Sequence, residues 1–243
     1  MAQHETTLEQ LSLALGEANI TSSPRQRELL ARHLDLVIDR NRVVNLTRIT
    51  SVEEAVVLHV VDSLLLLDSF AAAPRGAFVD VGTGAGFPGI PLAIMTDRPA
   101  LLVDSVGKKA AAVGAFVEEL GLGGQVEVSS SRIEDLGRKR RGQFAAVTAR
   151  AVAQTDVLVE YGAPLLARGG RLVVAKARPT DDEVAAGDRA ARICGLRRVS
   201  RETFELPRDL GHREVLAYER VGNPSIKLPR PVGVARQRPL GKR

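Results

Sequence analysis

Residues 78–91 read Phe-Val-Asp-Val-Gly-Thr-Gly-Ala-Gly-Phe-Pro-Gly-Ile-Pro, and this stretch decides the fold. Residues 78–81 have the composition of a short buried strand, apolar apart from one aspartate. Gly82, Gly84 and Gly86 then bring three residues without a Cβ into one turn, which can adopt positive φ and approach a flat ligand closely. Strand, glycine turn and helix in this order predict the nucleotide-binding corner of a doubly wound α/β sheet.

Two glycine patterns overlap in this turn, and they indicate different ligands. Gly-x-Gly-x-Gly from residue 82 fits a loop that holds S-adenosylmethionine, whereas Gly-x-Gly-x-x-Gly from residue 84 fits the dinucleotide fingerprint. Asp104 follows at about the distance expected of a ribose-binding acid. Asp80 favours the methyl donor, because a carboxylate would repel a pyrophosphate but suits a sulfonium cation. A glycine-rich turn without a ligand is the remaining alternative.

Further motifs accompany the glycine turn in a fixed order: Asn45-Leu46-Thr47, His59-Val60-Val61-Asp62-Ser63-Leu64, Asp104-Ser105-Val106-Gly107-Lys108-Lys109, Ser131-Arg132-Ile133-Glu134 and Thr148-Ala149-Arg150-Ala151. Together with residues 80–91 they resemble the RsmG family, also called glucose-inhibited division protein B. Its members are bacterial small-subunit rRNA guanine-N7 methyltransferases. The resemblance runs from about residue 25 to the C-terminal residues. It implies that the chain transfers a methyl group from S-adenosylmethionine to N7 of a guanine in 16S rRNA, within the small ribosomal subunit or its precursor.

Helical and strand patterns alternate along the chain after an all-helical start. Helices are predicted over residues 8–18, 24–42, 51–70, 108–120, 153–166 and 180–193. Strands are predicted over residues 78–81, 100–104, 125–129, 144–148, 170–175, 196–205 and 212–220. We therefore expect an α/β, Rossmann-like class I methyltransferase fold, with a seven-stranded, mostly parallel sheet whose last strand is antiparallel. We divide the chain into an N-terminal helical cap (residues 1–72), a cofactor-binding domain (73–220) and a basic, proline-rich tail (221–243).

Composition and charge narrow the class of protein. Hydrophobic residues at 44% and charged residues at 26% are ordinary for a soluble globular protein, and the longest apolar run is too short to cross a bilayer. Cys194 is the sole cysteine, which excludes an internal disulfide and a cysteine-based zinc site. We expect a cytoplasmic, metal-free monomer without a membrane anchor.

The basic excess of the chain is concentrated in the tail. Residues 221–243 contain six lysines and arginines and no acid, whereas the other 220 residues carry a net charge of −1. Such a segment suits contact with RNA phosphates, and a disordered solubilising tail is an equal alternative.

The cofactor candidates follow from the strand ends and from the resemblance. Asp104, after the second strand, can accept hydrogen bonds from both ribose hydroxyls. The resemblance implies that Ile133 packs on the adenine ring and that Glu134 lies alongside. The full set of cofactor candidates is Asp80, Gly82, Gly84, Gly86, Phe87, Asp104, Ile133, Glu134 and Arg150.

The substrate candidates are His59, Asp62, Ser63, Lys108, Arg150 and Lys176. The first three share one helix face, where they either border the substrate or brace the cap. Lys108 begins a helix, where the dipole disfavours a cation, so an RNA phosphate or a solvated surface pair accounts for it equally. Arg150 can bind phosphate or carboxylate bidentately at the carboxyl edge of the sheet. Lys176 reaches the same edge or is an ordinary surface lysine.

The chain lacks the groups that several methyltransferase reactions need. Thr-Ala-Arg-Ala-Val-Ala follows the fourth strand, in place of the Asn/Asp-Pro-Pro-aromatic run of amino-group methyltransferases, and no cysteine lies near to attack a pyrimidine. Guanine N7 is already nucleophilic and carries no proton, which agrees with a site without an acid or base. The alternatives are a small-molecule methyltransferase, a nicotinamide-dependent oxidoreductase and a non-catalytic ribosome assembly factor.

Overall fold

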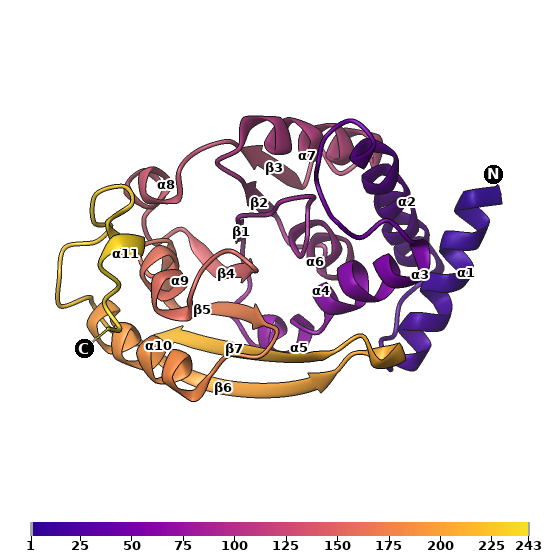
Figure 1. The fold of residues 1–243 in the computed structure, drawn as a ribbon. Helices are drawn as coiled ribbons and strands as arrows, with labels where there is room; N and C mark the ends of the chain where they lie inside the picture. Colours follow the sequence, from indigo (N-terminus) through magenta and orange to yellow (C-terminus); the bar gives the residue numbers. More distant parts are fainter. Residues whose placement is uncertain (1, 243) are drawn as a thin grey trace.

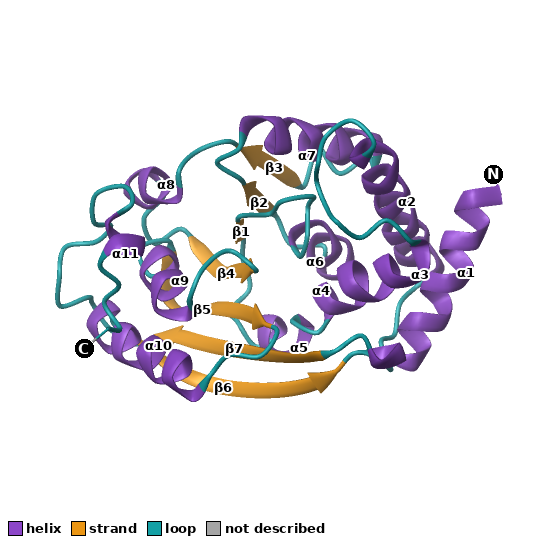
Figure 2. Cartoon of the chain, in the orientation of Figure 1, coloured by secondary structure: helices purple, strands orange, loops and turns teal. Residues whose placement is uncertain are grey.

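The computed structural model describes residues 2–242, whose strands form one mixed sheet between two layers of helices (Figure 1, Figure 2). The strand order is β3-β2-β1-β4-β5-β7-β6. Pairing is parallel from β3 to β5, and β7 is antiparallel to both of its neighbours. The strands are β1 (Phe78–Val81), β2 (Ala100–Val103), β3 (Val126–Ser129), β4 (Phe144–Arg150), β5 (Leu166–Lys176), β6 (Leu196–Glu205) and β7 (His212–Arg220). The predicted class I sheet with a reversed last strand is confirmed.

Both faces of the sheet are buried because side chains alternate along each strand. Phe78, Leu102 and Val173 belong to one hydrophobic core, whereas Val79 and Val147 belong to the core on the opposite face. The order of the strands reverses between β1 and β4, so a crevice opens at the carboxyl ends of these two strands. The glycine turn follows β1 at this crevice.

The helices divide between the two faces (Figure 1). One layer contains α1 (Ala2–Glu17), α2 (Pro24–Asn41), α3 (Val52–Ala55), the π-helix η1 (Val56–Val61), α4 (Asp62–Leu64), α5 (Leu67–Ala71), α6 (Gly89–Thr96) and α7 (Gly107–Glu119). The other contains α8 (Ile133–Lys139), α9 (Thr155–Gly162), α10 (Asp181–Cys194) and α11 (Val234–Gln237). A short 3-10 turn, η2 (Pro207–Asp209), joins β6 to β7. No helix within residues 2–242 is long and apolar enough to cross a membrane.

Three predicted helices differ from the structure, and the first, predicted over residues 8–18, already begins at Ala2. Residues 51–70 do not form one continuous helix, because a π-helical stretch over Val56–Val61 and a turn before Leu67 interrupt it. This stretch contains four valines, which crowd a regular α-helical turn. The helix predicted over residues 153–166 ends at Gly162, and β5 begins at Leu166. Pro164, two residues beyond Gly162, cannot continue the helix.

The N-terminal helices share a core with the sheet. Leu11, Leu30, Leu34 and Val60 lie in the same buried cluster as Phe78 of β1. The start of α2 is fixed by its sequence, since Ser23 caps the helix in a capping box with Gln26. The functional division of the chain at residues 72 and 220 stays a prediction.

The C-terminal residues are ordered against the body of the protein. Leu228 and Ala235 are buried, and residues 221–242 pack beside α8, α9 and α10 (Figure 1). The structure therefore decides against a disordered tail, although Arg243 lies outside the described residues. Cys194 is buried in the core.

Candidate active site

The glycine turn has the backbone conformation that its sequence predicts. Gly82, Gly84 and Gly86 have φ values of 71°, 61° and 92°, a region that favours glycine. A Cβ on Gly82 would lie 2.5 Å from Val152 Cγ2, so this residue has neither the conformation nor the space for a side chain. The turn therefore presents bare backbone at the end of β1.

Asp80 braces this turn from beneath. Its side chain is fully buried, and its carboxylate accepts hydrogen bonds from the Gly89 amide at 3.0 Å and the Thr148 hydroxyl at 2.9 Å. Burial raises the pKa of Asp80 to about 6, against the opposing effect of these hydrogen bonds. Asp80 does not line the pocket, so the direct contact with a sulfonium that the sequence suggested finds no support in this geometry.

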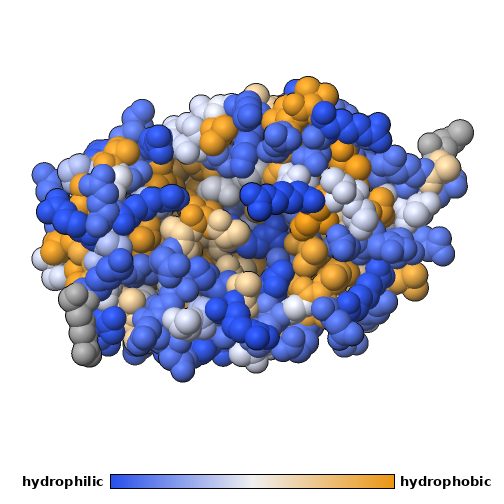
Figure 3. Space-filling view, viewed as in Figure 1, coloured by the Kyte–Doolittle hydropathy of each residue, from blue (hydrophilic) through white to orange (hydrophobic). Residues whose placement is uncertain are grey.

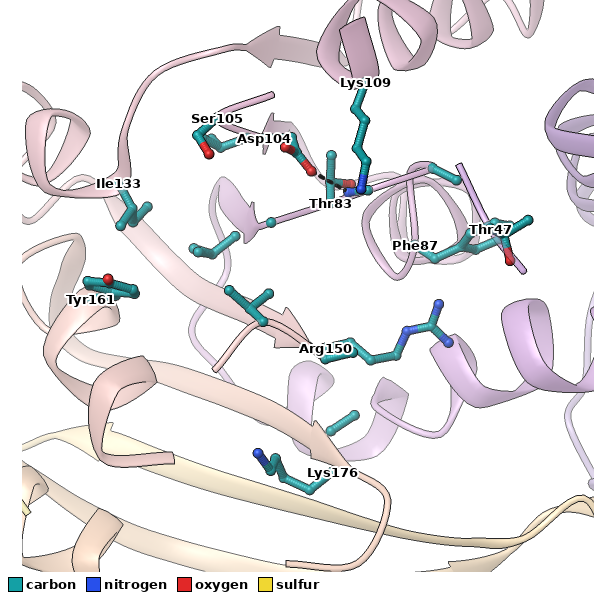
Figure 4. A pocket seen from close by; sticks show the side chains of 18 of the residues that line it. Thr47, Thr83, Phe87, Asp104, Ser105, Lys109, Ile133, Arg150, Tyr161 and Lys176 are labelled. Carbon is teal, nitrogen blue, oxygen red and sulfur yellow. Dashed lines mark hydrogen bonds between the residues drawn. The ribbon is translucent and has the colours of Figure 1, made fainter. Parts of the chain in front are cut away.

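A pocket of about 940 Å³ opens at the carboxyl edge of the sheet. Figure 3 shows a mainly hydrophilic surface around a central hollow where less hydrophilic side chains gather. In Figure 4, Ile133 and Tyr161 lie at one end of the pocket, and Phe87 and Arg150 lie toward the other. The cofactor and substrate candidates that line it are Gly82, Gly84, Phe87, Asp104, Ile133, Glu134, Arg150, His59, Asp62 and Lys176. Gly86, Ser63 and Lys108 do not line it.

Asp104 is held by the backbone at the mouth of the glycine turn. Its Oδ2 accepts a hydrogen bond from the Gly84 amide at 3.1 Å, and its Oδ1 accepts one from the Val106 amide at 2.9 Å (Figure 4). Each carboxylate oxygen has two acceptor sites, so both retain capacity for a ligand hydroxyl. The backbone has thus oriented a carboxylate that can receive a ribose.

Asp62 joins two arginines at the other end of the pocket. Its carboxylate is 2.8 Å from Arg150 Nη1 and 2.9 Å from Arg213 Nε. Arg150 Nη1 also donates to the Leu58 carbonyl at 2.9 Å, and its guanidinium lies 5.7 Å from the Phe87 ring centroid. The guanidinium of Arg150 is therefore fixed in place by two elements, and its remaining N–H groups stay available to a ligand.

His59 is stacked and neutral. Its ring lies parallel to Phe87, with centroids 4.8 Å apart, and its Nε2 is 2.9 Å from the Thr47 hydroxyl. Burial, assisted by the nearby Arg150 charge, lowers the pKa of His59 to about 3. Ser63 is buried behind it and donates to the His59 carbonyl. Ser63 thus braces the helix, and His59 reaches the pocket.

The lysine candidates have different surroundings. Lys176 Nζ is 2.7 Å from Glu183 and donates to the Ala153 carbonyl at 3.0 Å. Lys108 is exposed, and its neighbour Lys109 is the one that lines the pocket (Figure 4). The register of α7 determines which of two adjacent lysines faces inward, and a pair in sequence does not reveal it.

Known proteins with similar sequences identify the family of this chain. The family model of rRNA small subunit methyltransferase G matches residues 26–211. The chain belongs to this family. It is 35% identical to ribosomal RNA small subunit methyltransferase G of Lactobacillus acidophilus over 239 residues, which cover 96% of this chain and 98% of the relative. The corresponding protein of Chloroflexus aggregans is 39% identical, with 91% and 93% of the two chains covered.

Solved structures with a similar fold can also be compared with this member of the rRNA small subunit methyltransferase G family. A Corynebacterium glutamicum protein has a TM-score of 0.55 at 18% identity, with 87% of this chain and 97% of the other covered. A geranyl diphosphate methyltransferase in complex with sinefungin has a TM-score of 0.53 at 17% identity, with 66% and 77% covered. At such low identity the likeness shows the class I methyltransferase fold.

Arg213 and Tyr161 are two of the pocket residues that were not among the sequence candidates. Arg213 comes from β7, far along the chain from its partner Asp62, and no spacing in the sequence predicts their pairing. Tyr161 comes from the end of α9 and lies across the pocket from Phe87 (Figure 4). Its rarity was an available signal, because the chain has only two tyrosines. Within residues 2–242, no group of His, Cys, Asp or Glu side chains is arranged to hold a metal ion.

Proposed function

We propose that the protein transfers a methyl group from S-adenosylmethionine to N7 of a guanine in 16S rRNA. The donor supplies an electrophilic methyl group on a sulfonium. The chain contributes a bare glycine turn and the oriented Asp104 carboxylate for the ribose. Ile133 and Glu134 line the pocket beyond Asp104, where the adenine of the donor has room.

One observation carries the choice of N7. At the substrate end of the pocket, His59, Asp62 and Lys176 are the candidates for a general base. Each of them is already engaged by other residues of the described chain. His59 has a pKa lowered to about 3 by burial and bonds to Thr47. Asp62 is held between two arginines, and Lys176 is paired with Glu183. Guanine N7 attacks with an in-plane lone pair and needs no proton removed, so orientation alone suffices for this acceptor.

Cations at the rim suit an RNA substrate. Lys109, Arg132 and Arg178 line the pocket from three different segments. Each can neutralise a phosphate and release a counterion, which makes affinity dependent on salt. The scarcity of aromatic side chains, 3% of the chain, favours recognition by backbone contacts and RNA shape over base stacking.

The test is transfer of labelled methyl from S-adenosylmethionine to 16S rRNA, free and within 30S subunits, from cells lacking this modification. Nucleoside analysis should find the label in 7-methylguanosine. Asp104→Ala should abolish transfer by weakening donor binding, and Asp97→Asn, at an exposed helix end, is the matched control that keeps it. Label in any other nucleoside, or none from a chain that binds the donor, would overturn the proposal.

A further inference from the structure

The C-terminal residues 223–242, here called the C-terminal arm, lie along the pocket as well as along the surface. Val232, Gly233 and Arg236 of the arm line the opening beside Ile133, Glu134 and Tyr161. In the sequence these residues read as part of a basic segment for RNA. Their location is at the end of the pocket where the adenine of the donor has room.

The arm is anchored on both sides of this stretch. Arg230 forms a bidentate pair with Glu160 of α9, and its Nε donates to Glu160 Oε1 at 2.7 Å. The Glu160 side chain is only 3% exposed. Arg141 donates to the carbonyl of the buried Leu228. At the far end, the Gly241 carbonyl accepts from Arg189 at 2.8 Å, and a Cβ on Gly241 would lie 2.3 Å from the Ala186 carbonyl oxygen. The loop between the anchors is therefore held close to α8 and α9.

That loop bonds directly to a pocket residue. The Gly233 amide donates to Glu134 Oε1 at 2.9 Å, and Glu134 is 6% exposed. Gly233 has a φ of 82°, a conformation that glycine adopts without strain. Arg236 donates to the Val152 carbonyl at 3.2 Å, and Val152 packs against Gly82 of the glycine turn. The arm thus fixes one wall of the pocket and touches the segment that backs the turn.

The charges of the arm divide into two sets. Arg230 pairs with Glu160, and the exposed Arg236 donates to the Val152 carbonyl, whereas Lys227, Arg238 and Lys242 are exposed charges of the arm. An arm built only to attract RNA has no need of a buried anchor or of an amide aimed at Glu134. We propose that the C-terminal arm is part of the donor site, where Gly233 positions Glu134 and closes the adenine end of the pocket. This inference rests on the proposed function, since it takes the ligand to be S-adenosylmethionine.

Calorimetric titration with S-adenosylhomocysteine tests the arm without RNA. Gly233→Val strains the loop and displaces its amide, so the affinity for S-adenosylhomocysteine should fall about tenfold or more. The Michaelis constant for the donor should rise likewise, with that for rRNA unchanged. Lys227→Ala, which removes an exposed charge of the same arm, should change neither the affinity for S-adenosylhomocysteine nor the Michaelis constant for the donor.

The outcomes separate this inference from the proposed function. A wild-type chain that does not bind S-adenosylhomocysteine would defeat the proposed function itself. Wild-type affinity in Gly233→Val, or a loss of rRNA affinity alone, would overturn the role of the arm and leave the proposed function intact. Gly233→Ala, with a smaller side chain at the same positive φ, serves as a second variant, and full donor affinity in that chain would also overturn the role. Thermal unfolding without ligand controls for loss of structure in each variant.

Discussion

Arg150 shows how a correctly chosen residue can have a different setting from the one predicted. The sequence suggests an arginine at the carboxyl edge of the sheet that is free to bind a ligand, but its side chain is 14% exposed and bonds to Asp62 and Leu58. Arg150→Met should therefore lower the free energy of unfolding by about 1–3 kcal/mol, because Asp62 keeps Arg213 as a partner. Methyl transfer should fall much further, by about a hundredfold or more, since the guanidinium lines the pocket.

Urea denaturation and a transfer assay on the same preparation would measure both effects. Arg171→Met is the matched control, because Arg171 pairs with Glu219 outside the pocket. Arg150→Met with wild-type turnover and an intact fold would remove Arg150 from the site.

Buried titratable groups give the protein a defined response to acid. The pKa of His33 is lowered to about 4 and that of His59 to about 3, mainly by burial, so each stays neutral in the fold while the unfolded chain takes up protons below about pH 6.5. Stability from these groups is present above pH 6.5 and is lost as the pH falls toward 4. Each should remove about 2 kcal/mol between pH 6.5 and 5.

Asp80 acts in the opposite direction. Its folded pKa is raised to about 6, so its contribution is present in acid and is lost as the pH rises through that value. It offsets about 1 kcal/mol of the histidine effect at pH 5. From these three groups alone, the free energy of unfolding should therefore fall by about 2–3 kcal/mol between pH 7 and pH 5. Urea titrations at the two pH values would show it, and His33→Gln should reduce the difference; an unchanged difference would refute the assignment.

Sequence patterns identified those pocket residues that lie at the carboxyl end of a single predicted strand. Asp104 follows β2 and Arg150 ends β4, and the carboxyl ends of parallel strands meet at one edge, so both were predictable. Arg213 was not, because the antiparallel β7 brings its amino end to that edge and nothing in the sequence pairs it with Asp62. Pairing across a fold is a property of the packed chain, and periodicity within a segment does not contain it.

At the scale of elements, strands were better predicted than helices of the N-terminal layer. The segments over β1, β6 and β7 have the predicted bounds, since short alternating or apolar runs between turn residues define them. The helix predicted over residues 51–70 is broken by η1. The sequence did not reveal this break, because the valines of η1 are buried on several sides and form no single apolar stripe. The π-helical stretch contains His59 and aims it at Phe87, so the irregular element is also a pocket element.

Two glycines in different elements should respond oppositely to alanine. Gly82→Ala places a side chain at positive φ and against Val152, and should lower the free energy of unfolding by about 2 kcal/mol or more. Gly114→Ala lies within α7 with open space around it, and should raise that free energy by about 0.5–1 kcal/mol. Thermal and urea unfolding of both variants would decide, and equal effects would show that conformation at the turn is not limiting.

At the scale of the whole molecule, the sequence located the basic segment but not its attachment. Charge counts showed the excess in residues 221–243, and no pattern there indicates that Arg230 inserts beside Glu160. The same holds for the N-terminal helices, which were predicted without the surface against which they pack. They pack on the sheet directly, and Phe70 of α5 meets Phe78 of β1 edge-on with ring centroids 4.9 Å apart.

This shared core predicts that the methyltransferase sheet does not fold alone. Removal of residues 1–72 would expose Phe78, Phe87 and Ile90 to solvent. In the intact protein these side chains lie in one core with residues of α2, η1 and α5. An exposed apolar surface of that kind drives aggregation. A fragment of residues 73–243 should therefore be insoluble or lack a cooperative thermal transition, whereas co-expression with residues 1–72 should restore both solubility and binding of S-adenosylhomocysteine. A soluble 73–243 fragment that melts sharply and binds this ligand would instead establish the cap as a separate unit.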